Sequence, residues 1–245
     1  MDKFLYVAMS GAKETLRAQT ANSHNLANAS TNGFRADLSA FQSRAVAGAG
    51  YASRVYATNS TTGWDQAVGA QMFTGRDLDV AVQGDGFIAV QGRDGREAYT
   101  RAGDLMIDAN GQLMTKTGLP VLGDGGPVSV PPNNSLAIAP DGTISIVPQG
   151  QGPETTASIG RIKLVNPGNQ NLDRGEDGLF RMKDGSDAPA DANLRVASGS
   201  LEASNVNAAE AMVNMIELAR NFELQVKAIK AAEDNGAVSS QLLRT

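Results

Sequence analysis

The spacing of apolar residues changes twice along this chain of 245 residues, and that change restricts its fold more than any other feature. At both ends, apolar side chains recur every three or four residues, which is the spacing of an α-helix. In the middle they alternate with a period of two, as they do in strands. The sequence therefore predicts the α+β class, with a helix at each end and an antiparallel β domain between them.

The first helical region is expected in residues 1–34. Its small or apolar side chains follow one narrow stripe, made of Leu5, Met9, Ala12, Leu16 and Leu26. The pattern stops at residues 28–33, a stretch rich in Asn and Gly. Because these residues tolerate the left-handed backbone of a helix end, we expect the helix to end there.

The second helical region is expected in residues 199–245. Asn207 can cap a helix, and Glu210 follows it at the spacing of a capping box. The pair Asn235-Gly236 predicts a break or an end, with a final turn through Leu242 and Leu243 as the alternative. The stripe of this helix alternates steps of four and three, as in a heptad repeat, and comprises Met212, Met215, Ala219, Phe222, Val226 and Ile229.

The two stripes predict that the helices pair as a coiled coil. An isolated helix of this length is marginal in water unless its apolar stripe is buried. The residues alone leave two arrangements open. Either the stripes pack only on each other, or they also pack on neighbouring subunits.

The central β domain is expected in residues 76–198. Residues 78–82 alternate, residues 84–86 form a Gly-Asp-Gly turn, and the apolar residues 87–90 follow. Asp-Gly or Asn-Gly pairs recur through this region and supply the positive φ angles of tight hairpins. Residues 35–75 are rich in polar and small residues, so we expect them to be an extended connection.

Composition excludes several classes of function. The chain has no Cys and a single His, His24, so thiol chemistry, disulfides and a multi-histidine metal site within one subunit are excluded. Its net charge is −5 and its basic residues are scattered, which disfavours nucleic acid. No run of about 18 apolar residues predicts a membrane span. We therefore expect no enzyme, no cofactor, no metal and no direct membrane insertion.

One long motif resembles the N-terminal signature of bacterial flagellar rod and hook proteins. Two further regions resemble the same family in the expected order, residues 78–87 with 99–104, and residues 199–206 with 212–216 and 220–223. The resemblance therefore spans essentially the whole chain. The N-terminal motif covers residues 25–35, and its signature positions are Asn25, Leu26, Ala27, Asn28, Thr31, Gly33 and Phe34.

The resemblance implies a structural subunit of the flagellar basal-body rod, the drive shaft that crosses the periplasm and transmits torque. It implies export by the flagellar type III apparatus, without a cleavable signal peptide. The terminal helices would form an inner coiled-coil tube around the export channel, in contact with copies of the same subunit and with other rod proteins. The resemblance thus favours stripes that pack both within and between subunits.

Features at the start of the chain indicate which member of the family it resembles. The opening Met1-Asp2, together with Tyr6, Ala8, Met9 and the compact length, is similar to proximal rod members. A distal rod paralogue is the alternative. A more remote alternative is a periplasmic glycan-binding β module, whose binding would need neither terminal helix.

Overall fold

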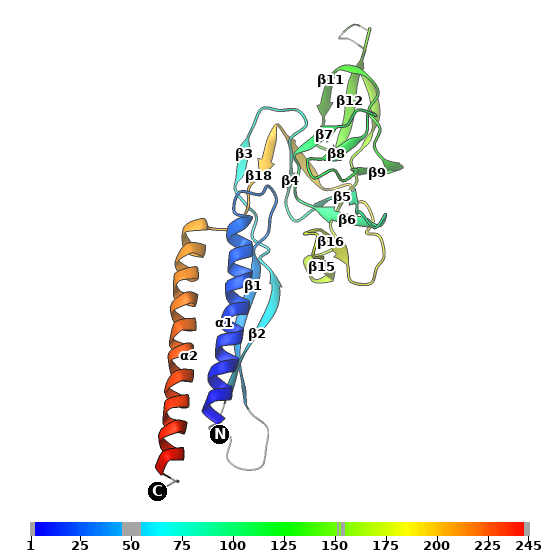
Figure 1. Ribbon diagram of the computed structural model, residues 1–245. Helices are drawn as coiled ribbons and strands as arrows, with labels where there is room; N and C mark the ends of the chain where they lie inside the picture. The colour runs from blue at the N-terminus through cyan, green and yellow to red at the C-terminus, as the bar shows by residue number, and fades with distance from the viewer. Residues whose placement is uncertain (1–2, 46–54, 151, 153–154, 243–245) are drawn as a thin grey trace. The chain divides into compact units, whose positions relative to one another are not determined.

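The structure is a computed structural model that describes residues 3–45, 55–150, 152 and 155–242. The chain divides into two compact units. Unit 1 is drawn from residues 1–29, 36–65 and 206–245, and unit 2 from residues 30–35 and 66–205. The predicted α+β class is confirmed, since the two long helices come from the two ends of the chain and the strands between them pair antiparallel (Figure 1). The opening Met1 and Asp2 lie outside the described residues.

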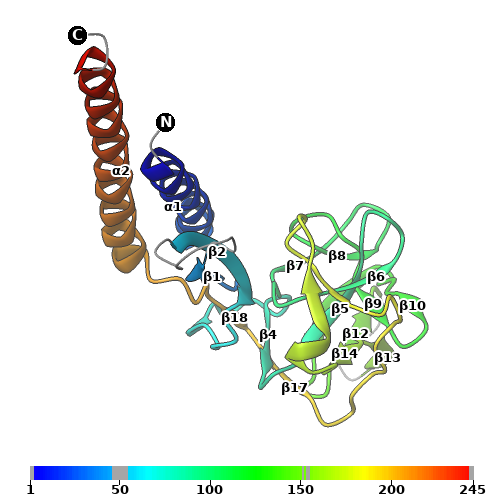
Figure 2. The same cartoon turned by 90° about the horizontal axis from the view of Figure 1, so that it is seen from below.

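Unit 1 consists of two helices and a β-hairpin. Helix α1 lies between α2 and the hairpin (Figures 1 and 2). The amide Nδ2 of Asn22 donates to the carbonyl of Ala211 at 2.7 Å, and a Cβ on Gly11 would meet the side chain of Gln225 at 3.0 Å. Because the later residue of α1 lies beside the earlier residue of α2, the helices are antiparallel. The elements are α1 (Lys3–Ala27), β1 (Asp37–Ala45), β2 (Val55–Trp64) and α2 (Ala208–Leu242).

The hairpin corrects one expectation from the sequence. Residues 35–75 were expected to be an extended connection, but β1 and β2 pair antiparallel along their whole length, with a bulge between Leu38 and Ser39. A two-stranded hairpin is marginal in water by itself. Here α1 covers it, and the hydroxyl of Ser10 donates to the carbonyl of Ala57 at 3.3 Å. Strand β1 lacks alternation because most of its side chains are exposed, so the sequence carries no strand signal there.

The end of α1 and the start of α2 agree with their sequence signals, whereas the end of α2 does not. Helix α1 ends at Ala27, as expected. The side-chain oxygen of Asn207 accepts hydrogen bonds from the N–H groups of Ala209 (3.1 Å) and Glu210 (3.3 Å), so Asn207 caps α2. The break predicted at Asn235-Gly236 is wrong, because α2 continues to Leu242. One Gly costs a helix only about 1 kcal/mol, which a helix of 35 residues tolerates.

Unit 2 contains short antiparallel strands. Its largest sheet has five strands in the order β14-β5-β6-β16-β15, and a second sheet has the order β11-β12-β13. Two-stranded pairs β17-β4, β18-β3, β7-β8 and β10-β9 complete the described part of the unit. The strands are β3 (Gln71–Phe73), β4 (Val80–Gln83), β5 (Phe87–Gln91), β6 (Glu97–Thr100), β7 (Leu105–Ile107), β8 (Leu113–Thr115), β9 (Leu122–Gly123), β10 (Gly126–Pro127), β11 (Asn133–Ile138), β12 (Thr143–Pro148), β13 (Ala157–Arg161), β14 (Leu164–Val165), β15 (Leu172–Arg174), β16 (Phe180–Met182), β17 (Arg195–Ser198) and β18 (Ser200–Glu202), with a short 3-10 helix at Asn169–Asn171.

Aliphatic side chains fill the core of unit 2. Ile88, Leu105, Leu113, Ile144 and Ile162 are fully buried. The turns between the strands use the predicted Asp-Gly and Asn-Gly pairs. Five of their glycines have positive φ angles, namely Gly95 (79°), Gly111 (81°), Gly142 (86°), Gly178 (77°) and Gly185 (74°). In the turn at Asp124-Gly125-Gly126, the second glycine, Gly126, has the positive angle (110°).

Carboxylates in three of these turns predict how stability depends on pH. Backbone N–H groups that donate to Asp108, Asp141 and Asp184 hold the pKa of each carboxyl below its ordinary value of 3.8. A lowered pKa in the folded state stabilises the fold above pH 3.8, and that stabilisation is lost as the pH falls through the lowered pKa. We expect the thermal midpoint to be level above about pH 5 and to fall below pH 3.8.

Calorimetry from pH 2 to 6 would measure this dependence. Changing all three residues, Asp108→Asn, Asp141→Asn and Asp184→Asn, keeps an acceptor oxygen in each turn but removes the titrating group. The fall should then be shallower than in the parent protein. An equally steep fall in the triple variant would contradict the assignment.

Candidate functional site

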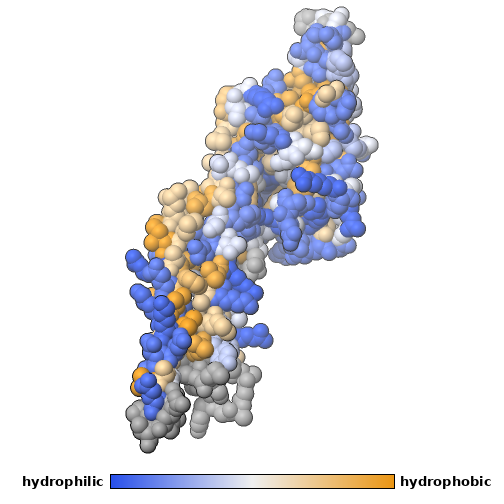
Figure 3. Space-filling view, viewed as in Figure 1, coloured by the Kyte–Doolittle hydropathy of each residue, from blue (hydrophilic) through white to orange (hydrophobic). Residues whose placement is uncertain are grey.

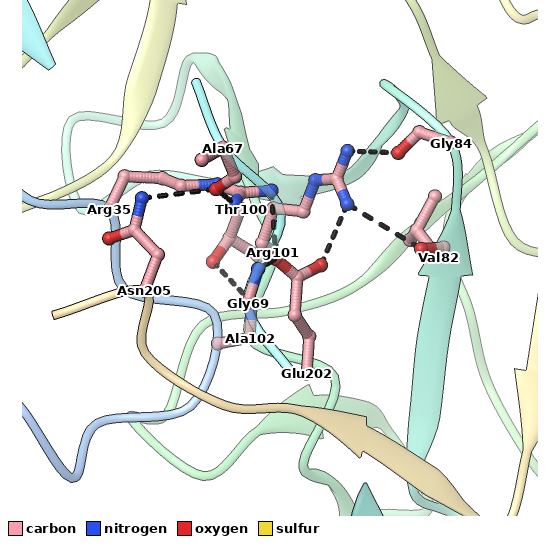
Figure 4. A network of polar contacts seen from close by, with 10 residues as sticks. All are labelled: Arg35, Ala67, Gly69, Val82, Gly84, Thr100, Arg101, Ala102, Glu202 and Asn205. Atoms are coloured by element: carbon pink, nitrogen blue, oxygen red, sulfur yellow. Dashed lines mark hydrogen bonds and ion pairs between the residues drawn. The ribbon is translucent and has the colours of Figure 1, made fainter. Parts of the chain in front are cut away.

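A buried cluster of one carboxylate and two guanidinium groups lies in unit 2 (Figure 4). Glu202 Oε1 is 2.8 Å from Arg35 Nη2, and Glu202 Oε2 is 2.7 Å from Arg101 Nη1. The exposed fractions of the three side chains are 1%, 2% and 2%, respectively. We call Arg35, Arg101 and Glu202 the clamp. Because two cations share one anion, the clamp carries one positive charge in excess.

Backbone groups complete the surroundings of the clamp. Arg35 donates to the carbonyl of Ala67, and Arg101 donates to the carbonyl of Gly84. The N–H of Gly69 donates to Glu202 Oε1 at 3.0 Å. A buried charge is costly unless hydrogen bonds and opposite charge surround it, so these carbonyl dipoles help to offset the excess positive charge.

Main-chain hydrogen bonds join the same segments around the clamp. The N–H of Gly33 donates to the carbonyl of Glu202 at 2.7 Å, and the N–H of Asn205 donates to the carbonyl of Phe34 at 3.3 Å. The amide Nδ2 of Asn205 donates to the carbonyl of Ala67 at 3.0 Å. The clamp therefore ties together residues 30–35, 66–70 and 199–205.

Arg174, at the end of β15, supports the first of these segments. Its Nη1 donates to the carbonyl of Arg35 at 2.6 Å, and its guanidinium lies 4.7 Å from the centre of the Phe34 ring. A cation over an aromatic face is attracted by the charge distribution of the ring. Arg174 thus contacts the side chain of residue 34 and the main chain of residue 35.

The clamp lies where the chain passes between the two units. The chain changes unit after residues 29, 35, 65 and 205. Each change occurs within a few residues of a group bonded in or around the clamp, namely Gly33, Arg35, Ala67 and Asn205. We call the stretches of chain at these four boundaries the linkers. Each linker therefore begins or ends beside the clamp.

Unit 2 holds another ion pair, half-buried, away from these linkers. Lys163 Nζ lies 2.8 Å from both carboxylate oxygens of Glu97. Nearby, the phenol oxygen of Tyr99 accepts a hydrogen bond from the N–H of Ala188 at 2.6 Å, and burial raises the pKa of that phenol. This pair is less buried than the clamp, and it joins only strands and loops of the β core.

The N-terminal motif has several structural roles. In unit 1, the side chain of Asn25 forms two hydrogen bonds with the backbone of Asp37. Its Nδ2 donates to the Asp37 carbonyl (3.0 Å), and its Oδ1 accepts from the Asp37 N–H (2.7 Å). Asn28 donates from its side chain to the carbonyl of His24, which ends α1. Leu26 is half-buried and Ala27 is exposed.

The remaining motif positions belong to unit 2. The carbonyl of Thr31 accepts from the N–H of Phe34 in a turn at 3.3 Å. Gly33 has φ of +68°, and a Cβ there would lie 2.3 Å from the backbone carbon of Arg101. Only glycine fits this position without displacing the chain that carries a clamp residue.

The predicted stripe on α1 is shifted by about one position from the face that is buried in this chain. Ala12 is buried, Leu5 and Leu26 are half-buried, and Met9 and Leu16 are 54% and 47% exposed. The residues actually buried on this helix are Ala8, Ala12, Glu14, Thr15 and Ala18. Since α1 is covered on two sides, small side chains let its neighbours approach closely.

The predicted stripe on α2 is partly buried. Met212 is 54% exposed, whereas Met215, Ala219, Phe222, Val226 and Ile229 are half-buried. The most buried positions are two alanines that the stripe omits, Ala211 and Ala232.

Large apolar side chains remain exposed on both helices (Figure 3). Figure 3 shows apolar groups along the helices, interspersed with polar ones. On α2, the exposed residues lie on a different face from Ala211 and Ala232. The exposed apolar residues are Tyr6, Met9 and Leu16 on α1, and Met212, Val213, Ile216, Leu224 and Val238 on α2.

Two features are absent from the part of the chain that the structure describes. No group of three or more His, Asp or Glu residues there is placed to hold a metal ion. No helix there is both long and apolar enough to cross a membrane.

Comparison with known proteins identifies the family. The chain is 46% identical to the flagellar basal-body rod protein FlgF of Escherichia coli, over 99% of each chain. The chain belongs to the flagellar basal-body rod protein family. It is also 45% identical to FlgF of Salmonella typhimurium, over 99% of each chain, and 31% identical to the rod protein FlgG of Bacillus subtilis, over 96% of each chain.

The rod relatives bear out the prediction of a structural subunit rather than an enzyme. The higher identity to FlgF supports the predicted proximal rod member over the distal paralogue.

Three family descriptions match this rod protein, and each match contains one clamp residue. "Flagella basal body rod protein" matches residues 5–35, which include Arg35. "Flagellar hook protein FlgE/F/G D1 domain" matches residues 81–146, which include Arg101. "Flagellar basal body rod FlgEFG protein C-terminal" matches residues 197–242, which include Glu202. The clamp therefore joins all three parts of the rod protein that the family descriptions recognise.

Sequence reasoning did not identify the clamp as a site. Its three residues stand inside the motifs that carry the family resemblance, each flanked by small or apolar neighbours. A single charged residue among uncharged neighbours was the available sequence signal for a buried charge. This signal does not indicate which charged residues form ion pairs with one another.

Proposed function

We propose that this rod protein polymerises, with copies of itself and with other rod proteins, into the shaft that crosses the periplasm and transmits torque. Its two helices would pair as a coiled coil, and their exposed apolar faces would become buried against neighbouring subunits in an inner tube around the export channel. The chain would be exported by the flagellar type III apparatus without a cleavable signal peptide. The observation that carries the proposal is the apolar face on each helix that the chain itself leaves uncovered.

The exposed face of α2 supports contacts between subunits. Met212, Val213 and Ile216 lie within the first turns of the helix, and Ile216 is 63% exposed. The opposite face of the same helix already packs within unit 1, through Ala211 and Phe222. Proteins that remain monomeric rarely expose contiguous apolar surface, so a second apolar face indicates a second protein partner.

The proposed mechanism is mechanical. Contacts between different faces of identical subunits do not close into a dimer but build a helical array. Twisting such an array requires close-packed side chains to slide past one another, and dense packing resists small displacements. Torque would therefore pass along the shaft through the stiffness of its interfaces.

Ile216→Asp tests the exposed face of α2. The free chain should keep its free energy of unfolding to within about 0.5 kcal/mol, because the side chain is largely in water. Swimming should be lost, because the assembled shaft would bury a charge. The matched control is Asn214→Asp, which places the same charge at an exposed position on the same turn of the helix but not on this apolar face. The proposal would be contradicted by normal swimming with Ile216→Asp.

Electron microscopy of basal bodies tests the overall role. Cells that lack this protein should have no rod and none of the structures beyond it, and expression of the parent chain should restore both. A glycan-binding module would leave the rod complete. Intact basal bodies in the deletion strain would therefore overturn the proposed function.

A further inference from the structure

We propose that the clamp is a conformational lock that holds the linkers where they leave unit 2, rather than a support for the β core. The lock is closed when the single carboxylate of Glu202 holds both Arg35 and Arg101. It then fixes residues 30–35, 66–70 and 199–205 against one another.

The position of the clamp relative to the core supports this role. The aliphatic cluster that fills unit 2 is built from side chains such as Ile88, Leu113 and Ile144. Among the clamp residues, Arg101 contacts the core, because its Nη1 donates to the carbonyl of Val82 at 3.5 Å and its guanidinium lies 5.3 Å from the centre of the Phe87 ring. The groups that Arg35 and Glu202 hold are instead the backbone of Ala67 and Gly69, both in a linker.

The linkers have little other order of their own. Residues 66–70 are in neither helix nor strand, and residues 203–207 lie between β18 and α2 without regular structure. Several of their backbone bonds run from one segment to the other. The N–H of Ala203 donates to the carbonyl of Ala70 at 2.8 Å, and Gly33 and Asn205 bond as described above. Opening the clamp would therefore remove a fixed point that these segments share.

The chemistry of the clamp suits a lock. Apolar contacts are not directional, whereas a guanidinium presents its N–H groups in a rigid planar fork. Arg35 uses that fork to join Glu202 and Ala67 at once, and so fixes the direction in which the chain leaves residue 35. An apolar residue of equal volume would fill the space without setting that direction.

Spin labelling of the purified full-length chain tests the lock and does not depend on rod assembly. The chain has no cysteine, so a single introduced cysteine takes the label at one site. Val68→Cys places the label on the linker, between the two residues whose backbones the clamp holds, at a half-exposed position. Ser135→Cys places it on an exposed position of β11, as a reference in the β part of unit 2.

Glu202→Gln should turn the spectrum of the label at residue 68 from mainly immobile to mainly mobile, and leave the label at residue 135 unchanged. Arg35→Lys keeps the charge but loses the fork, so it should mobilise the label at residue 68 to a smaller extent, and it serves if Glu202→Gln does not fold. The matched control is Lys163→Met, which breaks the half-buried Lys163–Glu97 pair and should leave the label at residue 68 immobile.

Two results would overturn the proposal. An immobile label at residue 68 in both clamp variants would show that the linkers do not need the clamp. Equal mobilisation at residues 68 and 135 would show that the clamp supports the β core as a whole.

Discussion

Replacing Glu202 with alanine is expected to lower the free energy of unfolding of the full chain by about 3–5 kcal/mol. The change leaves the guanidinium groups of Arg35 and Arg101 buried together, with no carboxylate between them. It also removes the acceptor of the Gly69 N–H. Urea unfolding followed by circular dichroism measures the loss, while fluorescence of the single Trp, Trp64, reports on unit 1.

Two further variants separate charge from packing. Adding Arg35→Met and Arg101→Met to Glu202→Ala removes the unbalanced charges, so part of the lost free energy should return. The control is Asp177→Asn, which breaks the partly exposed pair between Asp177 and Arg181 (2.7 Å) and should cost under about 1 kcal/mol. The explanation fails if Glu202→Ala costs no more than this control.

Gly33→Ala is expected to cost about 3 kcal/mol or more. The residue has φ of +68°, a conformation that costs an L-residue roughly 1–2 kcal/mol. In addition, the new Cβ would lie 2.3 Å from the backbone of Arg101, so the chain on one side must move, and overpacking of this kind costs typically 1–3 kcal/mol. Urea unfolding again provides the measurement.

Gly118→Ala is the matched control for this change. Gly118 has φ of +82°, but a Cβ there would meet nothing within 4 Å. It should therefore show only the backbone cost, roughly 1–2 kcal/mol. If the two variants lose equal stability, close packing of Gly33 against Arg101 is not the reason for glycine at that position.

Local signals in the sequence were sufficient for the fold class and for several element ends. The change of period placed a helix at each end and strands between them, because periodicity reflects which side of an element is buried. Asn207 marked the start of α2, and the glycines after Asp or Asn marked the hairpin turns. Each of these signals acts within a few residues of its effect.

Other features depend on tertiary contacts that no local pattern records. The β1–β2 hairpin exposes most of the side chains of β1, so it has no alternating signature. The predicted stripe on α1 includes Ala12, which is buried in this chain, and Met9 and Leu16, which are exposed. Because α1 is covered on two sides, it also buries alanines outside the stripe, Ala8 and Ala18.

The clamp could not be predicted from the sequence, because its residues lie far apart along the chain. Arg101 and Glu202 are 101 positions apart, and Arg35 is farther from Glu202 still. Each residue looks like an ordinary surface charge until the fold buries it. Only the antiparallel pairing of β18 with β3, which brings Glu202 opposite Gln71, places the carboxylate beside the linker at residues 66–70.

The side-chain amide of Asn205 donates to the carbonyl of Ala67 at 3.0 Å, so the two ends of the segment 66–205 lie side by side. A segment whose ends already touch can be enlarged or trimmed between them without altering the path of the chain on either side. Loops of the β part that carry no clamp residue are therefore the places where this segment can change in size. Arg35 lies outside the segment and pairs with Glu202 within it, so the requirement for the clamp residues would stay the same.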